Sequence, residues 1–321
     1  MKKIITSIVC LFFIIAASPC WSLDEYPTKP IQLICPFSPG GTSDLSARIV
    51  GSKMAEILGQ PIVVLNKTGG GSSVGINYVA GSKPDGYTLL TASAGMVLIP
   101  MITPQLPYKM EDLVPLGRLV IWNNMIVVQK DIPIKSLPEF VAYAKKNPGT
   151  LSYSSSGIGN TSHFIGELIN MEFKLDIQHI PYPGENPAIT AVLGKHAQIS
   201  YVSLPTCLQH VKSGAVRAVT VLSNQRDPEL PQVSTSAEEG YPDLIASSYH
   251  IFYAPAKIPA SILKKLETTL EKALQDKEVC SKIEALGLTV SYQNSQETKK
   301  FLDNEYKKWV VVARKANIVI K

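Results

Sequence analysis

Apolar positions fall into short runs and helical repeats along the chain, and loops rich in glycine, serine and threonine separate them. The clearest example is residues 31–58. Residues 31–37 form an apolar run typical of a buried strand, and apolar side chains after residue 44 recur at helical spacing. Between them, Pro39-Gly40-Gly41 permits a sharp turn and residues 42–44 offer N-cap chemistry. The stretch predicts a helix N-terminus that favours anions.

The same strand, glycine loop and helix plan recurs twice. Residues 62–66 read as a strand followed by a loop at 67–75, and residues 151–156 lead into a third loop that ends at residue 162. A further strand is predicted at 87–93. These segments indicate a parallel, right-handed α/β unit whose strand ends open at one edge. Ordinary turns between strands and helices also contain glycine and serine, so one such loop would not indicate a binding site. The prediction of anion-binding loops rests on their repetition.

Two long apolar runs, 119–129 and 247–255, stand where the chain passes between two blocks of α/β pattern. They predict two α/β domains joined by two crossover strands, with domain 1 formed by residues 23–124 and 250–321 and domain 2 by residues 125–249. Other predictions are an irregular segment at 100–117, a helix at 136–147, a strand at 215–223, a surface segment at 224–244, and helices near 260–275, 277–286 and 296–313.

The first 22 residues have the character of an export signal. Lys2 and Lys3 precede an apolar run at 4–17 that is too short to span a membrane. We expect a signal peptide at residues 1–22, cleavage near Ser22 and export of the remaining chain. Lipidation at Cys20 is an alternative.

Charge and cysteine usage exclude several classes of protein. Residues 1–22 hold two lysines and no acid, so the rest of the chain has 29 basic and 26 acidic residues, a net charge of +3. Both signs are interspersed, which does not fit a nucleic-acid-binding surface. Cys35, Cys207 and Cys280 are widely spaced, so we expect buried free thiols and not a disulfide framework.

Enzyme motifs are weak in this sequence. Residues 71–75 match G-x-S-x-G, which makes Ser73 a candidate hydrolase nucleophile, but an intervening loop separates them from the preceding strand. The five histidines have no metal-ligand spacing and no dinucleotide fingerprint is complete, so we expect neither a metal nor a cofactor. His163 suits an orienting role at a helix start, and His196 and His210 suit solvent-facing positions.

Four segments together resemble the substrate-binding proteins of tripartite tricarboxylate transporters, the Bug family of periplasmic receptors: YPTKPIQLICPFSPGGTSDLSARI, VVLNKTGGGSSVGINYVAGSKPDGYTLL, LSYSSSGIGNTSHFIGELI and HIPYPGENPAITAVLGKHAQI. The resemblance covers essentially the whole chain after the leader. It implies a type II periplasmic binding protein fold, in which two α/β domains close on a carboxylate-bearing solute that passes to a membrane transporter.

The resemblance also implies a site in which the first and third loops hold one ligand carboxylate, partly through water. Carried over, it comprises Gly40, Gly41, Thr42, Ser43 and Asp44 on one side and Ser155, Ser156, Gly157, Asn160, Thr161 and Ser162 on the other. Asn66 and Ser93 are further cleft-edge candidates. We expect Asp44 to fix the loop, because a carboxylate facing an anion would repel it.

Several positions depart from the family pattern, among them PYPGEN in place of PYKG and Ser248-Tyr249-His250 where tryptophan and glycine are common. No acid occurs between Gln198 and Thr206 that would pair with an ammonium group. This favours di- or tricarboxylates over amino acids, with Tyr201 and Ser203 as candidate contacts to the distal end of the ligand. Ordinary strand-end packing is the alternative for both.

The sequence therefore predicts a non-enzymatic, monomeric solute receptor that closes by hinge bending and delivers its ligand to the membrane subunits of a transporter. One alternative is a secreted hydrolase that uses Ser73. Another is a receptor that feeds a sensor protein.

Overall fold

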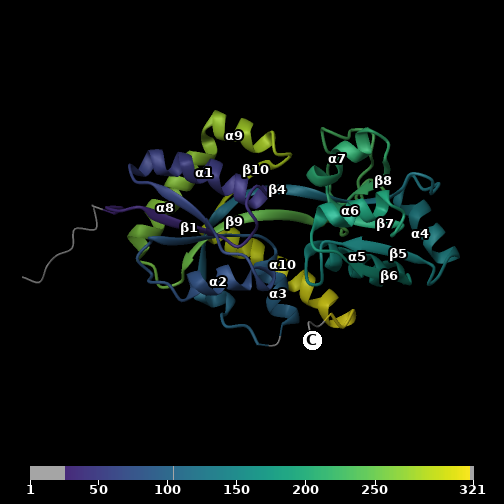
Figure 1. Cartoon of the computed structure of the whole chain (residues 1–321), viewed down its shortest axis with the longest axis horizontal. Helices are drawn as coiled ribbons and strands as arrows, with labels where there is room; N and C mark the ends of the chain where they lie inside the picture. The colour runs from purple at the N-terminus through teal and green to yellow at the C-terminus, as the bar shows by residue number, and fades with distance from the viewer. Residues whose placement is uncertain (1–25, 104, 319–321) are drawn as a thin grey trace, which may run out of the picture.

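A computed structural model of the chain describes residues 26–103 and 105–318. The predicted signal peptide and its cleavage site lie outside the described residues. The described chain forms two lobes that lie side by side, and helices cover the faces of a central sheet in each (Figure 1).

Three parallel strands form the centre of the first lobe. These are β1 (Ile31–Cys35), β2 (Ile62–Asn66) and β3 (Thr88–Ala92), which pair in the order β2-β1-β3. Helix α1 (Thr42–Leu58) follows β1 and helix α2 (Ser73–Ala80) follows β2. The predicted parallel unit is confirmed, and short apolar runs separated by glycine loops account for it.

The second lobe repeats this plan with β5 (Leu151–Ser155), β6 (Ile177–Pro181) and β7 (Ile199–Ser203), in which β5 pairs in parallel with both others. Helices α4 (Leu137–Lys146), α5 (Thr161–Phe173), α6 (Glu185–Leu193) and α7 (Leu204–Lys212) cover it, and β8 is Val216–Val221. Because β5, β6 and β7 are parallel, the loops that follow them start from one edge of the sheet.

Two long strands connect the lobes. Strand β4 (Leu113–Gln129) pairs with β9 (Ser247–Pro255) over its first part and with β7 and β8 over its second, all antiparallel. The strand begins six residues earlier than the predicted start at 119, and α3 (Gly95–Ile102) precedes it. The expectation of an irregular segment at 100–117 was therefore wrong at both ends.

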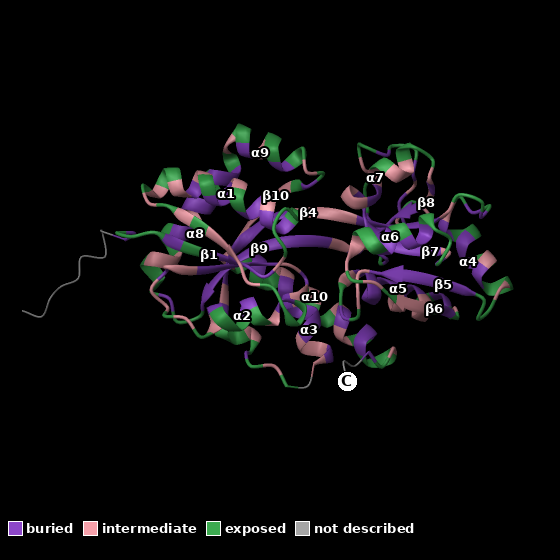
Figure 2. Cartoon of the chain, in the orientation of Figure 1, coloured by how far each residue is buried: buried purple, intermediate pink, exposed green. Residues whose placement is uncertain are grey.

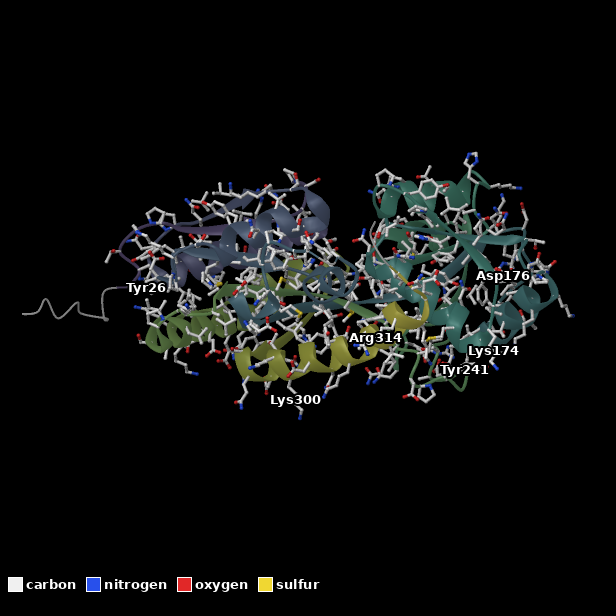
Figure 3. All side chains as sticks on the ribbon, turned by 90° about the horizontal axis from the view of Figure 1, so that it is seen from below. Tyr26, Lys174, Asp176, Tyr241, Lys300 and Arg314 are labelled. Atoms are coloured by element: carbon white, nitrogen blue, oxygen red, sulfur yellow. The ribbon has the colours of Figure 1, made fainter. Side chains whose placement is uncertain are left out.

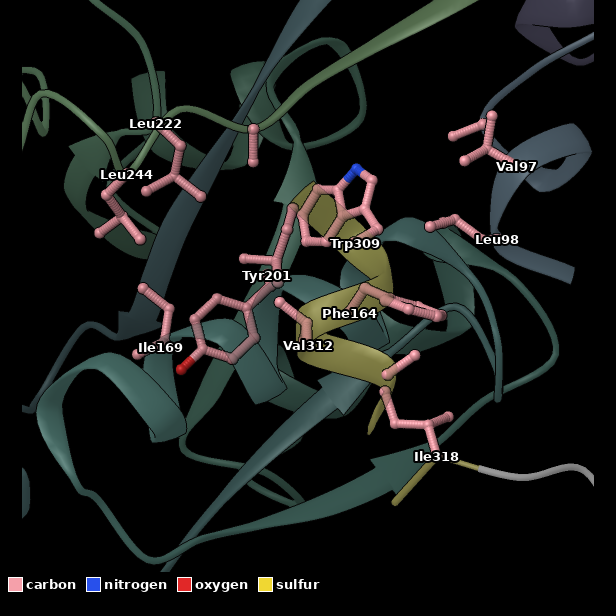
Figure 4. Packing of buried hydrophobic residues seen from close by; sticks show 14 of the residues in the cluster. Val97, Leu98, Phe164, Ile169, Tyr201, Leu222, Leu244, Trp309, Val312 and Ile318 are labelled. Atoms are coloured by element: carbon pink, nitrogen blue, oxygen red, sulfur yellow. The ribbon is translucent and has the colours of Figure 1, made fainter. Parts of the chain in front are cut away.

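The last part of the chain returns to the first lobe and then reaches the second. It contains α8 (Ala260–Gln275), α9 (Lys277–Glu284), β10 (Thr289–Asn294) and α10 (Ser295–Lys315), and β10 pairs with β4. Helix α10 runs along one side of the molecule from Lys300 to Arg314 (Figure 3). Its Trp309 ring meets the Phe164 ring of α5 edge-on at 5.8 Å, in the cluster of Figure 4. Where a domain boundary falls remains a prediction.

Strand interiors are buried in both lobes, whereas the outer helix faces are exposed (Figure 2). The segment 224–244, predicted to be a surface segment, is more firmly anchored than expected. Leu230, Thr235 and Ser236 are fully buried in it, and the Ser236 hydroxyl donates to the Leu244 carbonyl at 2.8 Å. Many of its other residues, among them Arg226, Glu229 and Asp243, are exposed, so the predicted surface segment is confirmed and a few buried side chains anchor it.

Cys35 and Cys207 are buried free thiols, as predicted, whereas Cys280 is half-buried. None of the helices in the described ranges combines the length and apolar character that a membrane span requires.

Candidate functional site

The first glycine loop leads into an open helix N-terminus. Gly41 is the N-cap of α1 in an extended conformation, and no side chain caps it. The prediction that residues 42–44 cap the helix was therefore wrong, because these residues form its first turn and the N-cap lies one residue earlier. Their main-chain N–H groups donate to no described residue, which leaves three donors at the positive end of the helix.

Asp44 organises this loop. Its carboxylate accepts from the Gly40 N–H at 3.0 Å and from two Arg48 nitrogens at 2.9 and 3.0 Å. Asn66 at the end of β2 donates to Asp44 at 2.8 Å and to the Phe37 carbonyl at 2.9 Å. Burial raises the pKa of Asp44, but the hydrogen bonds from Arg48, Gly40 and Asn66 together lower it to about 2. The Asp44 charge is thus neutralised locally by Arg48.

The Ser43 side chain is hydrogen-bonded to a histidine on the connecting strand β9. The Nε2 atom of His250 lies 2.5 Å from the Ser43 hydroxyl and its Nδ1 atom lies 3.0 Å from the Ser46 hydroxyl. His250 is 1% exposed and packs edge-on against Trp122. Burial lowers the pKa of His250 to about 3, so the imidazole is neutral and one ring nitrogen accepts a hydrogen bond.

The loop after β5 is fixed by its own serines. The Ser156 N–H donates to the Ser162 hydroxyl at 2.9 Å, and the Gly157 N–H donates to the Ser155 hydroxyl at 3.2 Å. Asn160 is the N-cap of α5, and its side chain donates to the Ser156 carbonyl at 2.7 Å. The N–H groups of Thr161 and Ser162 have no acceptor among the described residues, so α5 also presents open donors.

Two stacked histidines support this second loop. The rings of His163 and His179 are parallel with centroids 4.0 Å apart, and His179 Nε2 lies 2.6 Å from the Ser155 hydroxyl. His163 Nδ1 accepts from the Gly159 N–H at 3.2 Å, which fits its expected orienting role. Burial lowers the pKa of His163 to about 4, and burial together with His163 lowers the pKa of His179 to about 3. Both rings are neutral.

The remaining predicted positions lie in different surroundings. Ser93 is half-buried at the end of β3, and Ser203 ends β7 with its hydroxyl 2.5 Å from Glu185. Tyr201 is 1% exposed within the apolar cluster, beside Ile169 and Val312 in Figure 4, and its hydroxyl has no described hydrogen-bond partner. Its side chain therefore packs in the core, the alternative that the sequence left open.

The sequence did not indicate several residues of these hydrogen-bond networks: Arg48, His179, Glu185 and Thr206. It also did not indicate that His250 supports the loop at Ser43. The spacing of Asp44 and Arg48, four residues apart on a predicted helix, is a signal that was available. The others come from distant parts of the chain, and no local pattern marks them.

The described residues give the hydrolase alternative no support. Ser73 begins α2, and no hydrogen bond among the described residues joins it to a histidine. Its Oγ lies close to Gly70, where an added Cβ would be 2.3 Å away. In residues 26–103 and 105–318, no group of three or more His, Cys, Asp or Glu side chains is arranged to hold a metal ion.

Comparison with known proteins decides the family. The sequence profile described as "Tripartite tricarboxylate transporter family receptor" matches residues 46–318. The chain belongs to this receptor family. Protein BugT of Bordetella pertussis (strain Tohama I) is 34% identical to it over 303 residues, which cover 94% of this chain and 93% of BugT. The family consists of periplasmic solute receptors and not of enzymes, so the hydrolase alternative is excluded.

Several solved structures share the fold of this chain. "Structure of a periplasmic transporter" has a TM-score of 0.81 and 33% identity, covering 92% of this chain and all of that chain. Rpa4515 of R. palustris with adipate has a TM-score of 0.81 at 27% identity, covering 92% and 99%. MatC of Rhodopseudomonas palustris with bound malate has a TM-score of 0.78 at 27% identity, covering 89% and 99%. The predicted α/β periplasmic binding protein fold is confirmed.

Proposed function

We propose that this receptor captures a small di- or tricarboxylate, or a related organic acid, between its two lobes and delivers it to the membrane subunits of a tripartite tricarboxylate transporter. The observation that carries the proposal is the pair of open helix N-termini, α1 in one lobe and α5 in the other, each preceded by a rigid glycine and serine loop. The adipate and malate of the two related structures support a carboxylate ligand.

Electrostatics favours an anion at these loops. Main-chain N–H groups and helix N-termini attract negative charge without a free cation. Arg48 neutralises Asp44, the one acid within the α1 loop. The three supporting histidines are neutral, so they hold the loops without adding charge.

Ligand binding would favour a closed form. Contacts from both helix N-termini to one carboxylate exist only when the lobes approach, so a ligand shifts the population toward closure. Strands β4 and β9 connect the lobes and are the elements about which they would move. We place this activity in the periplasm, with residues 1–22 removed on export.

The proposal can be tested by deleting single main-chain donors. Thr42 and Thr161 occupy the first helical positions of α1 and α5, where proline is tolerated, and both preceding residues are extended, as a following proline requires. Thr42→Pro and Thr161→Pro should each weaken carboxylate binding by roughly 10- to 100-fold, the effect of one hydrogen bond to a charged group. Calorimetry with succinate, malate, adipate and citrate measures this.

Thr42→Ala and Thr161→Ala keep the N–H and serve as matched controls for the lost hydroxyl. Lys277→Pro, at the first position of α9, controls for the proline itself. Binding by both threonine-to-proline variants at wild-type affinity would contradict the proposal. So would the absence of any thermal stabilisation of the wild-type protein by the carboxylates.

A further inference from the structure

A carboxylate lies among hydroxyls at the end of β7. Oε2 of Glu185, the first residue of α6, accepts from the Ser203 hydroxyl at 2.5 Å and from the Thr206 hydroxyl at 2.6 Å. The two hydroxyls are 2.8 Å apart. Ser203 is 4% exposed and forms the N-cap of α7, so the cluster has a fixed geometry.

This cluster adjoins the anion-binding loop proposed for the second lobe. The Tyr182 N–H donates to the Ser155 carbonyl at 2.9 Å, and a Cβ on Gly157 would lie 3.4 Å from the Tyr182 carbonyl. Glu185 follows Tyr182 by three residues, after a turn closed by the Gly184 N–H. The loops after β5, β6 and β7 start from the same sheet edge, so Glu185 and the open N-terminus of α5 lie on one side of the lobe.

Glu185 differs from Asp44 in having no cation beside it. No salt bridge among the described residues includes Glu185, and its Oε1 accepts no hydrogen bond from them. The side chain is half-buried. A structural clip between α6 and α7 explains the two bonds to Oε2, and the N-termini of these helices favour a negative charge there, but neither gives the free Oε1 a partner. That charge would repel a second carboxylate and attract a cation.

We infer that the ligand carries an ammonium group in addition to its carboxylate, and that Glu185 binds this group. The inference rests on the proposed function, because the α1 and α5 N-termini must hold the carboxylate. It revises the preference for plain di- and tricarboxylates, which depended on the absence of an acid in residues 198–206. Glu185 supplies the acid from the loop after β6. The substrate class is therefore an amino acid.

The experiment compares carboxylates that differ only in the amino group. Binding to the full mature protein is measured by calorimetry for L-glutamate and glutarate, L-aspartate and succinate, and L-leucine and 4-methylpentanoate. The amino member of at least one pair should bind more tightly, by roughly 10- to 100-fold, which corresponds to one charge-assisted hydrogen bond.

Glu185→Gln keeps an acceptor for Ser203 and Thr206 but removes the charge. It should reduce the preference for the amino member to within about threefold and leave the affinity for the deaminated partner unchanged or improved, because an amide does not repel a second carboxylate. Glu229→Gln removes an equal charge from an exposed ion pair with Lys212 in the same lobe and should retain the preference. Melting of each ligand-free variant reports whether its fold is intact.

Tighter binding of the deaminated members by the wild-type protein would overturn the inference and leave the proposed carboxylate receptor standing. An equal loss of both members in Glu185→Gln, with ligand-free melting unchanged, would also overturn it. If no member of any pair binds, the proposed function itself fails, and the inference fails with it.

Discussion

Buried histidines hold the loops of the candidate site at the scale of single residues. The position of the proton on the neutral His250 ring, at Nδ1 or at Nε2, affects what Ser43 can bind. The Ser43 hydroxyl can donate to an anion only if the imidazole donates to it from Nε2, which requires that Nδ1 accept from Ser46. His250 is thus a positioning residue that acts on the ligand through Ser43.

Two amide variants separate the two ring nitrogens. His250→Gln places an amide group near the position of Nε2 and should keep the Ser43 contact, with carboxylate affinity within about threefold of wild type. His250→Asn reaches only the position of Nδ1 and should weaken binding by about 10-fold, because Ser43 loses its donor. Calorimetry and urea unfolding measure affinity and stability separately. Equal affinities in the two variants would show that His250 serves packing alone.

At the scale of elements, the distance between helix and strand depends on particular glycines. A Cβ on Gly166 in α5 would lie 2.3 to 2.7 Å from atoms of the Tyr153 side chain on β5. A Cβ on Gly51 in α1 would approach side chains of Ile62 and Leu33 no closer than 3.4 Å. Both glycines lie inside helices and have helical backbone angles. The effects of substituting them therefore differ because of side-chain packing and not because of backbone strain.

Gly166→Ala should lower the free energy of unfolding by about 1 to 3 kcal/mol, because Tyr153 must move and its hydrogen bond to Glu167 at 2.6 Å is disturbed. Gly51→Ala should be neutral or stabilise by up to about 1 kcal/mol through helix propensity. Urea unfolding of both variants tests the prediction. A stability gain in Gly166→Ala would mean that α5 lies farther from β5 than the structure places it.

Most elements could be predicted from the sequence because their apolar spacing is local. Strand β9 was predicted at its observed bounds, and β2 likewise. Strand β10 was missed because its side chains are largely polar and only half-buried, so the strand depends on pairing with β4. Helix α3 was missed for a different reason: Pro100 lies inside it, and a proline ordinarily argues against a helix.

At the scale of the whole molecule, helix α10 contacts both lobes. It packs near α3 and β4 in the first lobe, and its Trp309 reaches Phe164 of the second. The Lys308 ammonium also donates to the Ile245 carbonyl, close to the start of β9. Any hinge movement about β4 and β9 must therefore be accommodated by this helix.

Trp309→Ala should destabilise the protein by about 3 to 5 kcal/mol, since it removes a ring that is 1% exposed. Trp309→Phe keeps an aromatic ring against Phe164 but loses the indole donor to Glu305 and part of the buried ring volume, so a smaller loss, about 1 to 2 kcal/mol, is expected. Thermal and urea unfolding measure both. Similar stabilities for the two variants would contradict the bridging role of the ring.

The sequence by itself determined most of the strands, the glycine loops after them and the parallel α/β character of the first unit, because these depend on apolar spacing and backbone freedom within a few residues. It also brought the positions of the two helix N-termini close to those observed. Only the tertiary structure decided which side chains support these loops. Ser43 and His250 are 207 positions apart in the sequence, and Glu185 and Ser203 are 18 positions apart. Such pairs form where strand ends from distant segments meet at one sheet edge, and no local pattern encodes that meeting.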